Sequence, residues 1–376
     1  MNILIAADSF KESLSSFDVG IAIKTGLEKS INCCCEVVSI ADGGEGTMEL
    51  ITGILEGAYV NTITKDPLGR EIPTKFGLSY DRKTAIIDVA TSSGIELLAE
   101  TEKNPMKTSS YGTGQLINAA LEYDVESIIL GLGSSATVDL GLGMLSALGA
   151  KFLDESGNDI IICGESLKTI QAIDISELNP KLKGVEIKVA SDVNNPLVGP
   201  NGSVNVFARQ KGATDEQIVE LEQEFERIGQ LLTTQLNNEL LTYPGGGAAG
   251  GIGYICLMTL NSSLVSGSDL IMDLNRLQDK ISKADLVITG EGRFDLQSLN
   301  GKGPMSIIKM AKQHQKQVIV VCGSVDNQIY NHEAVAGVPI FATITKVASL
   351  AETLSSAKAN IEHTSAAIGY LYKLEN

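Results

Sequence analysis

Acidic and basic side chains suited to a metal-bound anion gather in the segment ITGEGRFDLQSLNGKGP, residues 288–304. Glu291 and Asp295 offer hard oxygen ligands, which suit Mg²⁺ and do not suit a soft metal. Arg293 and Lys302 carry charges that pair with phosphate or carboxylate oxygens. An apolar run typical of a buried strand precedes these charged residues. The segment therefore predicts a site for magnesium and an anion at the end of a strand.

The Gly-Lys pair of this segment does not belong to a nucleotide-binding P-loop. A Walker A loop needs a glycine five positions before that pair and Ser or Thr directly after it, because these residues shape the phosphate nest and reach the metal. Leu296 and Gly303 occupy those two positions here. Any nucleotide chemistry must therefore use another arrangement of residues.

A second candidate segment, DSFKES at residues 8–13, follows the first apolar run of the chain. Asp8, Ser9 and Lys11 combine a carboxylate, a hydroxyl and an ammonium at the carboxyl end of a strand, where open α/β sheets bind ligands. The structural alternative is that a serine only caps the next helix and that Lys11 is solvated. The stretch ADGGEGT, residues 41–47, is equally open between anion binding by helix amides and a turn capped by its aspartate.

A third segment, GLGSSATVDLGLG at residues 131–143, leaves a predicted strand and enters an apolar helix. Backbone amides in such a loop can bind phosphate, with the positive end of the helix behind them. The small residues are also compatible with close helix–sheet packing, but the hydroxyls favour phosphate. The predicted phosphate contacts are Gly133, Ser134, Ser135 and Thr137, and Lys211 of the segment QKGAT adds a cation beside another helix start.

A fourth segment, SDVNNPL at residues 191–197, places Asp192 at a further strand end, with carboxamides such as that of Asn195 after it. An aspartate beside an acceptor hydroxyl can orient that hydroxyl and take its proton, since phosphoryl transfer depends mostly on positioning and charge neutralisation. The alternative is an Asx turn before Pro196. The segment thus supplies a candidate general base.

The elements that must hold these segments alternate between strands and helices. Several apolar runs are continuous, which suits strands buried on both faces of a parallel sheet. The strand candidates are residues 3–5, 37–38, 84–89, 127–132, 185–190, 286–289, 317–321 and 339–342. Apolar residues at helical spacing predict helices over 218–228, begun by a capping box at Thr214 and Gln217, and over 350–371. We therefore predict an α/β fold.

The length of the chain predicts two domains, because 376 residues exceed the size of most single hydrophobic cores. The candidate crossings between them are the DPLGR stretch at residues 66–70 and a stretch near residues 275–283. Residues 1–70 and 284–376 then form a discontinuous α/β domain, and residues 71–283 form an inserted α/β domain.

Composition excludes several classes of partner and site. The net charge of −17, from 29 basic and 46 acidic residues, disfavours nucleic acid or an anionic membrane as the main partner. Because the chain has no signal-like start and no apolar run of spanning length, we expect a cytoplasmic protein. Six cysteines, three of them consecutive, and three scattered histidines fit neither a disulfide framework nor a zinc site.

Taken in order, nine segments resemble those of the bacterial glycerate kinase type I family, from residue 3 to about residue 325. They are DSFK, ADGGEGT, DPLGR, TSSYGTG, ATVD, DVNNPL, QKGAT, GGGAAGG and TGEGRFD. The resemblance implies ATP-dependent phosphorylation of D-glycerate with Mg²⁺, most often at the 2-hydroxyl. It also implies a discontinuous, doubly wound domain with a flavodoxin- or Rossmann-like parallel sheet and a second α/β domain inserted into it. The implied active site lies in the cleft between the two domains, and the implied fold differs from that of the P-loop kinases. A homodimer is compatible with this interpretation.

The resemblance gives the candidate residues roles. Asp192 is the expected base at the acceptor hydroxyl, and Asp8 and Lys11 are the other expected catalytic residues. The expected glycerate contacts are Ser9, Arg70, Arg293 and Asn195. The expected nucleotide contacts are Gly133, Ser134, Ser135, Thr137, Lys211 and Lys302. Glu291 and Asp295 are the expected Mg²⁺ ligands.

A few positions depart from the usual family pattern. In the glycine-rich loop, Val138 and Leu140 replace more polar or smaller residues, and Arg209 stands where proline usually precedes the QKGA segment. These changes concern nucleotide contacts and not the reaction class. The sequence leaves open a kinase that forms 3-phosphoglycerate or acts on a related hydroxy acid, and a non-catalytic sensor of glycerate or nucleotide.

Overall fold

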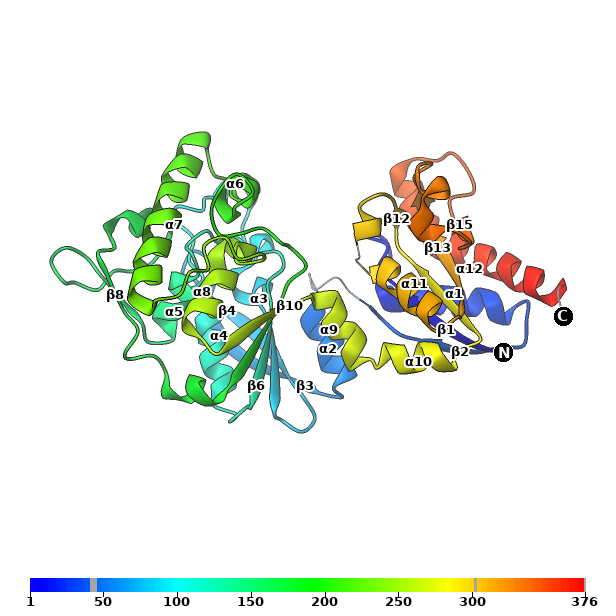
Figure 1. The fold of residues 1–376 in the computed structure, drawn as a ribbon, viewed down its shortest axis with the longest axis horizontal. Helices are drawn as coiled ribbons and strands as arrows, with labels where there is room; N and C mark the ends of the chain where they lie inside the picture. Colours follow the sequence, from blue (N-terminus) through cyan, green and yellow to red (C-terminus); the bar gives the residue numbers. More distant parts are fainter. Residues whose placement is uncertain (41–45, 301–302, 375–376) are drawn as a thin grey trace. The chain divides into compact units, whose positions relative to one another are not determined.

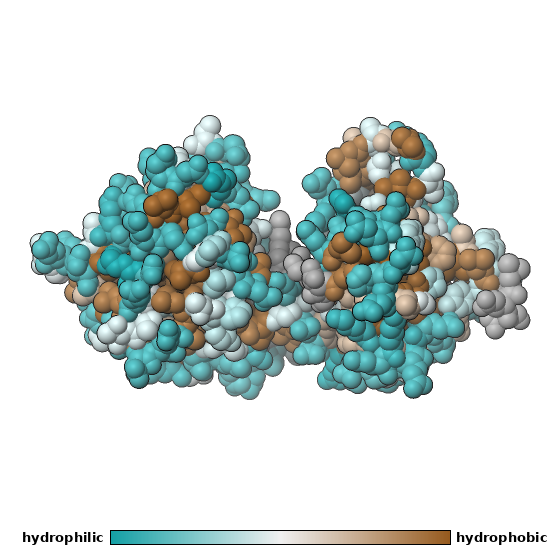
Figure 2. Space-filling view, turned by 45° about the horizontal axis from the view of Figure 1, so that its top comes forward, coloured by the Kyte–Doolittle hydropathy of each residue, from teal (hydrophilic) through white to brown (hydrophobic). Residues whose placement is uncertain are grey.

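The computed structural model describes residues 1–40, 46–300 and 303–374 (Figure 1). The chain forms two compact units. The first, Met1–Asp42 with Ser268–Asn376, contains both chain ends, and we call it the terminal unit. The second, Gly43–Gly267, is the inserted unit. Each unit shows mainly hydrophilic surface broken by smaller hydrophobic areas (Figure 2).

The terminal unit contains a five-stranded parallel sheet in the order β15-β13-β11-β1-β2. Its strands are β1 (Asn2–Ala7), β2 (Cys34–Val37), β11 (Leu286–Gly290), β13 (Gln317–Cys322) and β15 (Ile340–Ala342). From β1 the chain moves outward to β2, and from β11 it moves outward in the opposite direction to β13. The sheet is therefore doubly wound, and its topological switch point lies between β1 and β11.

Helices cover both faces of this sheet because successive side chains of each central strand point to opposite sides. Ile3 and Ile5 pack with α1 (Ser16–Glu28) and α12 (Leu350–Leu374). Leu4 and Ala6 pack with the opposite layer. That layer consists of α9 (Gly267–Leu274), α10 (Leu277–Lys283) and α11 (Gly303–Gln313). A two-stranded pair, β12 (Arg293–Phe294) with β14 (Ser324–Val325), extends from the loops that follow β11 and β13.

The inserted unit contains a six-stranded sheet in the order β10-β9-β6-β5-β4-β3. Its strands are β3 (Ala58–Lys65), β4 (Glu71–Leu78), β5 (Thr84–Asp88), β6 (Ser127–Gly131), β9 (Glu186–Ala190) and β10 (Ser262–Val265). The last four are parallel, and β3 and β4 form an antiparallel hairpin beside β5. A small antiparallel pair, β7 (Lys151–Leu153) with β8 (Ala172–Asp174), lies apart from this sheet.

Helices of the inserted unit bury one large apolar core against this sheet. The helices that contribute to it are α4 (Tyr111–Leu121), α5 (Leu142–Ala147), α6 (Ser203–Phe207), α7 (Asp215–Leu236) and α8 (Ile252–Thr259). Two further helices of this unit, α2 (Thr47–Ile54) and α3 (Ala90–Ser93), have buried residues that are not part of that core. The capping box predicted at Thr214 and Gln217 begins α7, whose buried residues include Ile218, Leu221 and Phe225. The predicted α/β class with parallel sheets is confirmed.

The crossings between the units lie elsewhere than the sequence suggested, at 42/43 and 267/268 instead of 70/71 and 283/284. The DPLGR stretch forms the turn of the β3–β4 hairpin, where the Asp66 N–H donates to the Arg70 carbonyl and the Gly69 N–H to the Asp66 carbonyl. Residues 277–283 form a helix whose Leu277 and Ile281 are buried in the core of the terminal unit. Residues 66–70 are therefore a hairpin turn and residues 277–283 a helix, and neither stretch links the two units.

Candidate active site

Asp8 and Glu291 follow neighbouring strands at the switch point of the terminal unit. Ala7 and Gly290 are partners in the parallel pairing of β1 with β11, and the Asp8 N–H donates to the Gly290 carbonyl at 2.7 Å. Ligands of doubly wound sheets bind outside the carboxyl ends of the strands at this point. The sheet topology therefore places two acidic residues, 283 positions apart in the chain, at the expected ligand site.

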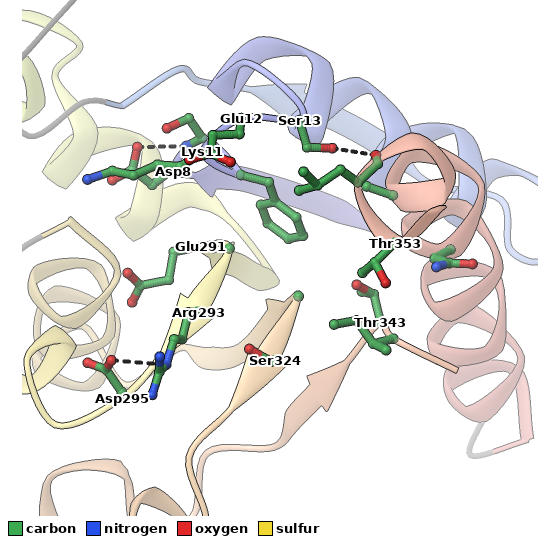
Figure 3. A pocket seen from close by; sticks show the side chains of 18 of the residues that line it. Asp8, Lys11, Glu12, Ser13, Glu291, Arg293, Asp295, Ser324, Thr343 and Thr353 are labelled. Atoms are coloured by element: carbon green, nitrogen blue, oxygen red, sulfur yellow. Dashed lines mark hydrogen bonds and ion pairs between the residues drawn. The ribbon is translucent and has the colours of Figure 1, made fainter. Parts of the chain in front are cut away.

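A pocket of about 910 Å³ lies at this site (Figure 3). Its lining includes six residues predicted from the sequence: Asp8, Ser9, Lys11, Glu291, Arg293 and Asp295. The structure thus brings together two of the predicted segments, those after β1 and after β11. The wall across the pocket comes from Thr343 and from α12, where Thr353 is labelled in Figure 3.

Glu291 is an acid of this pocket whose pKa is raised. Burial, with smaller contributions from the nearby Asp8 and Asp295 carboxylates, raises the pKa of Glu291 to about 7. Its Oε1 atom is buried and has no hydrogen-bond partner among the described residues. A buried oxygen without a donor is costly unless a ligand or cation completes it.

The pocket fits a Mg²⁺ ion held partly by substrate. Mg²⁺ commonly takes one or two carboxylates together with phosphate oxygens and water, so a full protein cage is not required. Glu291 offers its unpartnered oxygen. The Oδ1 of Asp295 accepts from the Gln297 N–H at 2.8 Å, and its Oδ2 lies 3.3 Å from the Nε of Arg293. No group of three or more His, Cys, Asp or Glu suited to a metal occurs among the described residues. Lys302, the remaining candidate of this segment, lies outside them.

A serine just after the DSFKES segment caps the next helix. Ser15 begins α1 by accepting from the Asp18 N–H at 3.1 Å, so the capping role that was the structural alternative belongs to a residue outside the segment. Ser13 instead donates to the Leu354 carbonyl of α12 at 2.8 Å. Lys11 is exposed and lines the pocket, where it can meet an anion.

Arg70, a predicted glycerate contact, lies in the inserted unit at the β3–β4 turn. Its guanidinium pairs with Asp66 and, at 2.7 Å, with Glu102. These hydrogen bonds, that to Asp66 foremost, raise the pKa of Arg70 above its ordinary value. Arg70 therefore braces the hairpin turn against the segment that contains Glu102.

Asp192 follows β9 in the inserted unit and is partly exposed. Its Oδ1 accepts from the Ser266 hydroxyl at 2.8 Å and from the Gly267 N–H at 3.0 Å. Asn195 donates from Nδ2 to the Asn201 carbonyl at 2.8 Å and so closes the loop after Asp192. The carboxylate is held in place by the residues that follow β10.

The glycine-rich loop after β6 already holds an anionic group of the protein itself, the carboxylate of Asp139. Asp139 is fully buried and accepts from the N–H groups of Gly141 at 3.1 Å and Gly143 at 3.3 Å. It also accepts from the N–H and the hydroxyl of Ser110, at 2.7 and 2.8 Å. Burial raises the pKa of Asp139, and these hydrogen bonds oppose that shift. Part of the expected phosphate nest therefore holds a carboxylate side chain.

Lys211, another predicted nucleotide contact, bonds to two residues of this loop. The buried Lys211 donates from Nζ to the Ser135 hydroxyl at 2.8 Å and to the Thr137 carbonyl at 2.9 Å. Burial lowers the pKa of Lys211 to about 7, and the Asp139 carboxylate opposes this shift. Ser134 is exposed and lines a separate pocket of about 530 Å³ that also contains Lys75.

Known proteins match this chain along nearly its whole length. The model described as "Glycerate kinase family" matches residues 3–373. The chain belongs to the glycerate kinase family. A glycerate 2-kinase of Escherichia coli (strain K12) is 41% identical over 96% of this chain and 95% of its own length. A glycerate kinase of Haemophilus influenzae (strain ATCC 51907 / DSM 11121 / KW20 / Rd) is 40% identical over 97% of each chain.

A solved structure extends the likeness to the fold of the glycerate kinase family. The crystal structure of a protein from Salmonella typhimurium LT2, provisionally named glycerate kinase 2, has a TM-score of 0.87 and 38% identity to this chain. The match covers 100% of this chain and 99% of that chain. The family resemblance seen in the sequence and the predicted fold are both confirmed.

The departures from the usual family pattern have visible structural consequences. Leu140 has a φ of 58°, in the left-handed region that glycine adopts without strain, and its side chain is fully buried. Val138 is also buried, and Arg209 is exposed and pairs with Asp215. The loop thus holds a left-handed residue whose side chain is part of the apolar core.

Sequence reasoning missed Asp139 and Ser110, which organise the glycine-rich loop. Both belong to segments that resemble the family, ATVD and TSSYGTG. Asp139 is a carboxylate between apolar residues, which indicated a buried role, whereas the polar neighbours of Ser110 gave no such sign. Within the described residues, no helix is long and apolar enough to cross a membrane.

Proposed function

We propose that this protein transfers the terminal phosphoryl group of ATP to the 2-hydroxyl of D-glycerate, with Mg²⁺ as cofactor. Membership of the glycerate kinase family supports the reaction class, and the Escherichia coli relative is named a glycerate 2-kinase. The observation that carries the proposal is that Asp8 and Glu291 directly follow the register partners Ala7 and Gly290 at the switch point of a doubly wound sheet. Both line a pocket that also contains Lys11 and Arg293.

The side chains of this pocket suit the charge changes of phosphoryl transfer. Glu291 and Asp295 would hold Mg²⁺, which when bound neutralises phosphate oxygens. Lys11 and Arg293 would meet anionic oxygens of phosphate or of the glycerate carboxylate, and the planar guanidinium is able to bind two oxygens at once. Asp8 adds a carboxylate beside Glu291, and Ser9 a hydroxyl for the substrate.

Asp192 is the proposed general base for the acceptor hydroxyl. The Ser266 hydroxyl and the Gly267 N–H both donate to its Oδ1, so these contacts orient the carboxylate. A carboxylate held in one orientation can take a proton from a hydroxyl placed beside it, which is the geometry that a general base requires. Asn195 is the proposed carboxamide contact from the same loop.

The inserted unit supplies the other proposed nucleotide contacts. Gly133 and Ser134 lie in the loop after β6, and Ser134 lines a pocket. The buried Lys211 donates hydrogen bonds to Ser135 and Thr137 and so holds this loop from the interior of the unit. We assign these three residues to holding the loop in shape for phosphate.

The test is an assay of ADP formation that depends on D-glycerate, followed by phosphorus NMR of the product. The proposal predicts ADP formed in equal amount to 2-phosphoglycerate. A product signal from 3-phosphoglycerate would reassign the accepting hydroxyl, and turnover that prefers another hydroxy acid in a substrate panel would reassign the substrate. Nucleotide binding without any glycerate-dependent ADP would point to a sensor and refute the proposed activity.

A further inference from the structure

The pocket of the terminal unit is too large for glycerate alone. Its volume of about 910 Å³ lies near the top of the range of about 300–1,000 Å³ that accommodates drug-sized ligands. A three-carbon acid occupies only a small part of such a space. The rest of the pocket extends along α12, away from the carboxylates after β1 and β11 (Figure 3).

We propose that this extension binds the nucleoside of ATP, with the base against α12. This inference rests on the proposed function and adds where the nucleotide lies. It identifies α12, the last helix of the chain, as a wall of the nucleotide site.

The lining of the extension has the chemistry of a base-binding surface. Leu350, Leu354 and Ala357 recur along α12 at helical spacing and present aliphatic groups to the pocket. Thr353 and Asn360 of the same helix place a hydroxyl and a carboxamide among them. Ligand pockets of this kind bury a flat apolar group and fix its orientation through a few polar side chains.

One of these apolar side chains is unusually accessible. Leu350 is 70% exposed although it lies in the first turn of a helix that packs closely elsewhere. A base stacked against Leu350 and Leu354 would remove apolar surface from water, at about 25 cal/mol per Å².

The charges at the other end of the pocket select the form of the ligand. Carboxylates outnumber cationic groups there: the acids are Asp8, Glu12, Glu291 and Asp295, and the bases are Lys11 and Arg293. A free triphosphate would be repelled by this excess of negative charge, whereas its magnesium complex would not. The pocket therefore fits a nucleotide whose phosphates arrive with a divalent cation.

The α12 wall is held firmly enough to be preformed. Ser13 donates to the Leu354 carbonyl at 2.8 Å, which ties the loop after β1 to the middle of this wall. Next to it α1 and α12 pack closely, since a Cβ added at Gly26 would lie 2.3 Å from the Glu362 carbonyl oxygen. Lys29 and Glu362 add an ion pair at 2.6 Å between the two helices.

The test compares two substitutions on one helix. Ala357→Trp fills the extension, and Ala359→Trp puts the same side chain on an exposed position outside the pocket. We expect Ala357→Trp to raise KM for ATP and the Kd for MgADP, measured by calorimetry, by about tenfold or more, which corresponds to about 1.4 kcal/mol. KM for D-glycerate should stay within about twofold, and Ala359→Trp should match the wild type in all three constants.

A milder variant guards against a folding defect. Thr353→Val keeps the side-chain shape and removes the hydroxyl, and it should raise the Kd for MgADP and for adenosine without changing the melting temperature. If both variants left the Kd for MgADP within twofold of the wild type, or if only KM for glycerate rose, the nucleoside would not lie against α12. Because MgADP binding is measured without turnover, this result is independent of whether the protein phosphorylates glycerate.

Discussion

The Asp8 carboxylate, at the end of β1, acts on the carboxyl group of Glu291 at the end of the adjacent parallel strand β11. The strand residues before them, Ala7 and Gly290, are register partners. Burial first, and then the Asp8 charge, raises the pKa of Glu291 to about 7. The end of β11 thus holds an acid that changes charge near neutral pH.

We expect the elevated pKa of Glu291 to reduce folding stability as pH rises. An unfolded glutamate releases its proton near the model value of 4.5, whereas folded Glu291 keeps its proton up to about 7. The folded state therefore binds more protons within that interval, so the free energy of unfolding falls from about pH 4.5 to about pH 7. Glu291→Gln should abolish this fall and be more stable than the wild type at pH 8 by on the order of 2 kcal/mol.

Urea unfolding of metal-free protein at pH 5 and pH 8 measures this difference. Glu333→Gln, at an exposed glutamate of the same unit, is the control and should keep the wild-type pH dependence. Parallel pH profiles for wild type and Glu291→Gln would show that Glu291 ionises normally.

Replacing Asp192 by asparagine should lower kcat by about 10² or more, as expected for loss of a general base. The asparagine keeps an oxygen that can accept from Ser266 and Gly267, so the loop should stay folded. Steady-state kinetics at saturating ATP and glycerate give the number. Asp154→Asn, in an exposed turn, serves as the control, and near-normal kcat in Asp192→Asn would remove Asp192 from the role of base.

Asp295→Ala should raise the Mg²⁺ concentration needed for half-maximal activity by about tenfold, because one carboxylate of the proposed site is lost. The measurement is a magnesium titration of activity at fixed total ATP. Asp279→Ala changes an exposed aspartate on α10 and should leave the titration unchanged. An identical magnesium requirement in both variants would argue against Asp295 as a ligand.

Gly250→Ala should destabilise the inserted unit by at least about 2 kcal/mol. Gly250 has a φ of +67°, which costs an L-residue about 1–2 kcal/mol, and a Cβ there would lie 2.0 Å from the Thr137 carbonyl oxygen. The GGGAAGG segment and the glycine-rich loop are thus packed backbone to backbone. Gly184→Ala, where a Cβ meets open space, should change the thermal midpoint little; equal midpoints for the two variants would show that the loop relaxes freely.

Local pattern was sufficient to identify most of the elements that carry the site. Continuous apolar runs predicted β1, β11 and β13 because a strand buried on both faces must be apolar throughout. The capping box predicted the start of α7 because a helix leaves its first N–H groups to be satisfied by nearby side chains. These are interactions between residues close in sequence.

The meaning of the polar segments was decided only by tertiary structure. The neighbours Asp8 and Glu291 are brought together by strand pairing between opposite ends of the chain, which no local pattern encodes. The DPLGR stretch is a hairpin turn and not a linker, because its flanking strands pair with each other and then with β5.

The same reason explains the glycine-rich loop. Its letters correctly predicted a backbone that offers N–H groups, but whether those groups face solvent or an internal carboxylate depends on how the chain closes around them. In the folded protein Gly141 and Gly143 donate to Asp139. Residue types and their spacing predicted which groups could bind an anion, and the packing of the chain determined which of them already do.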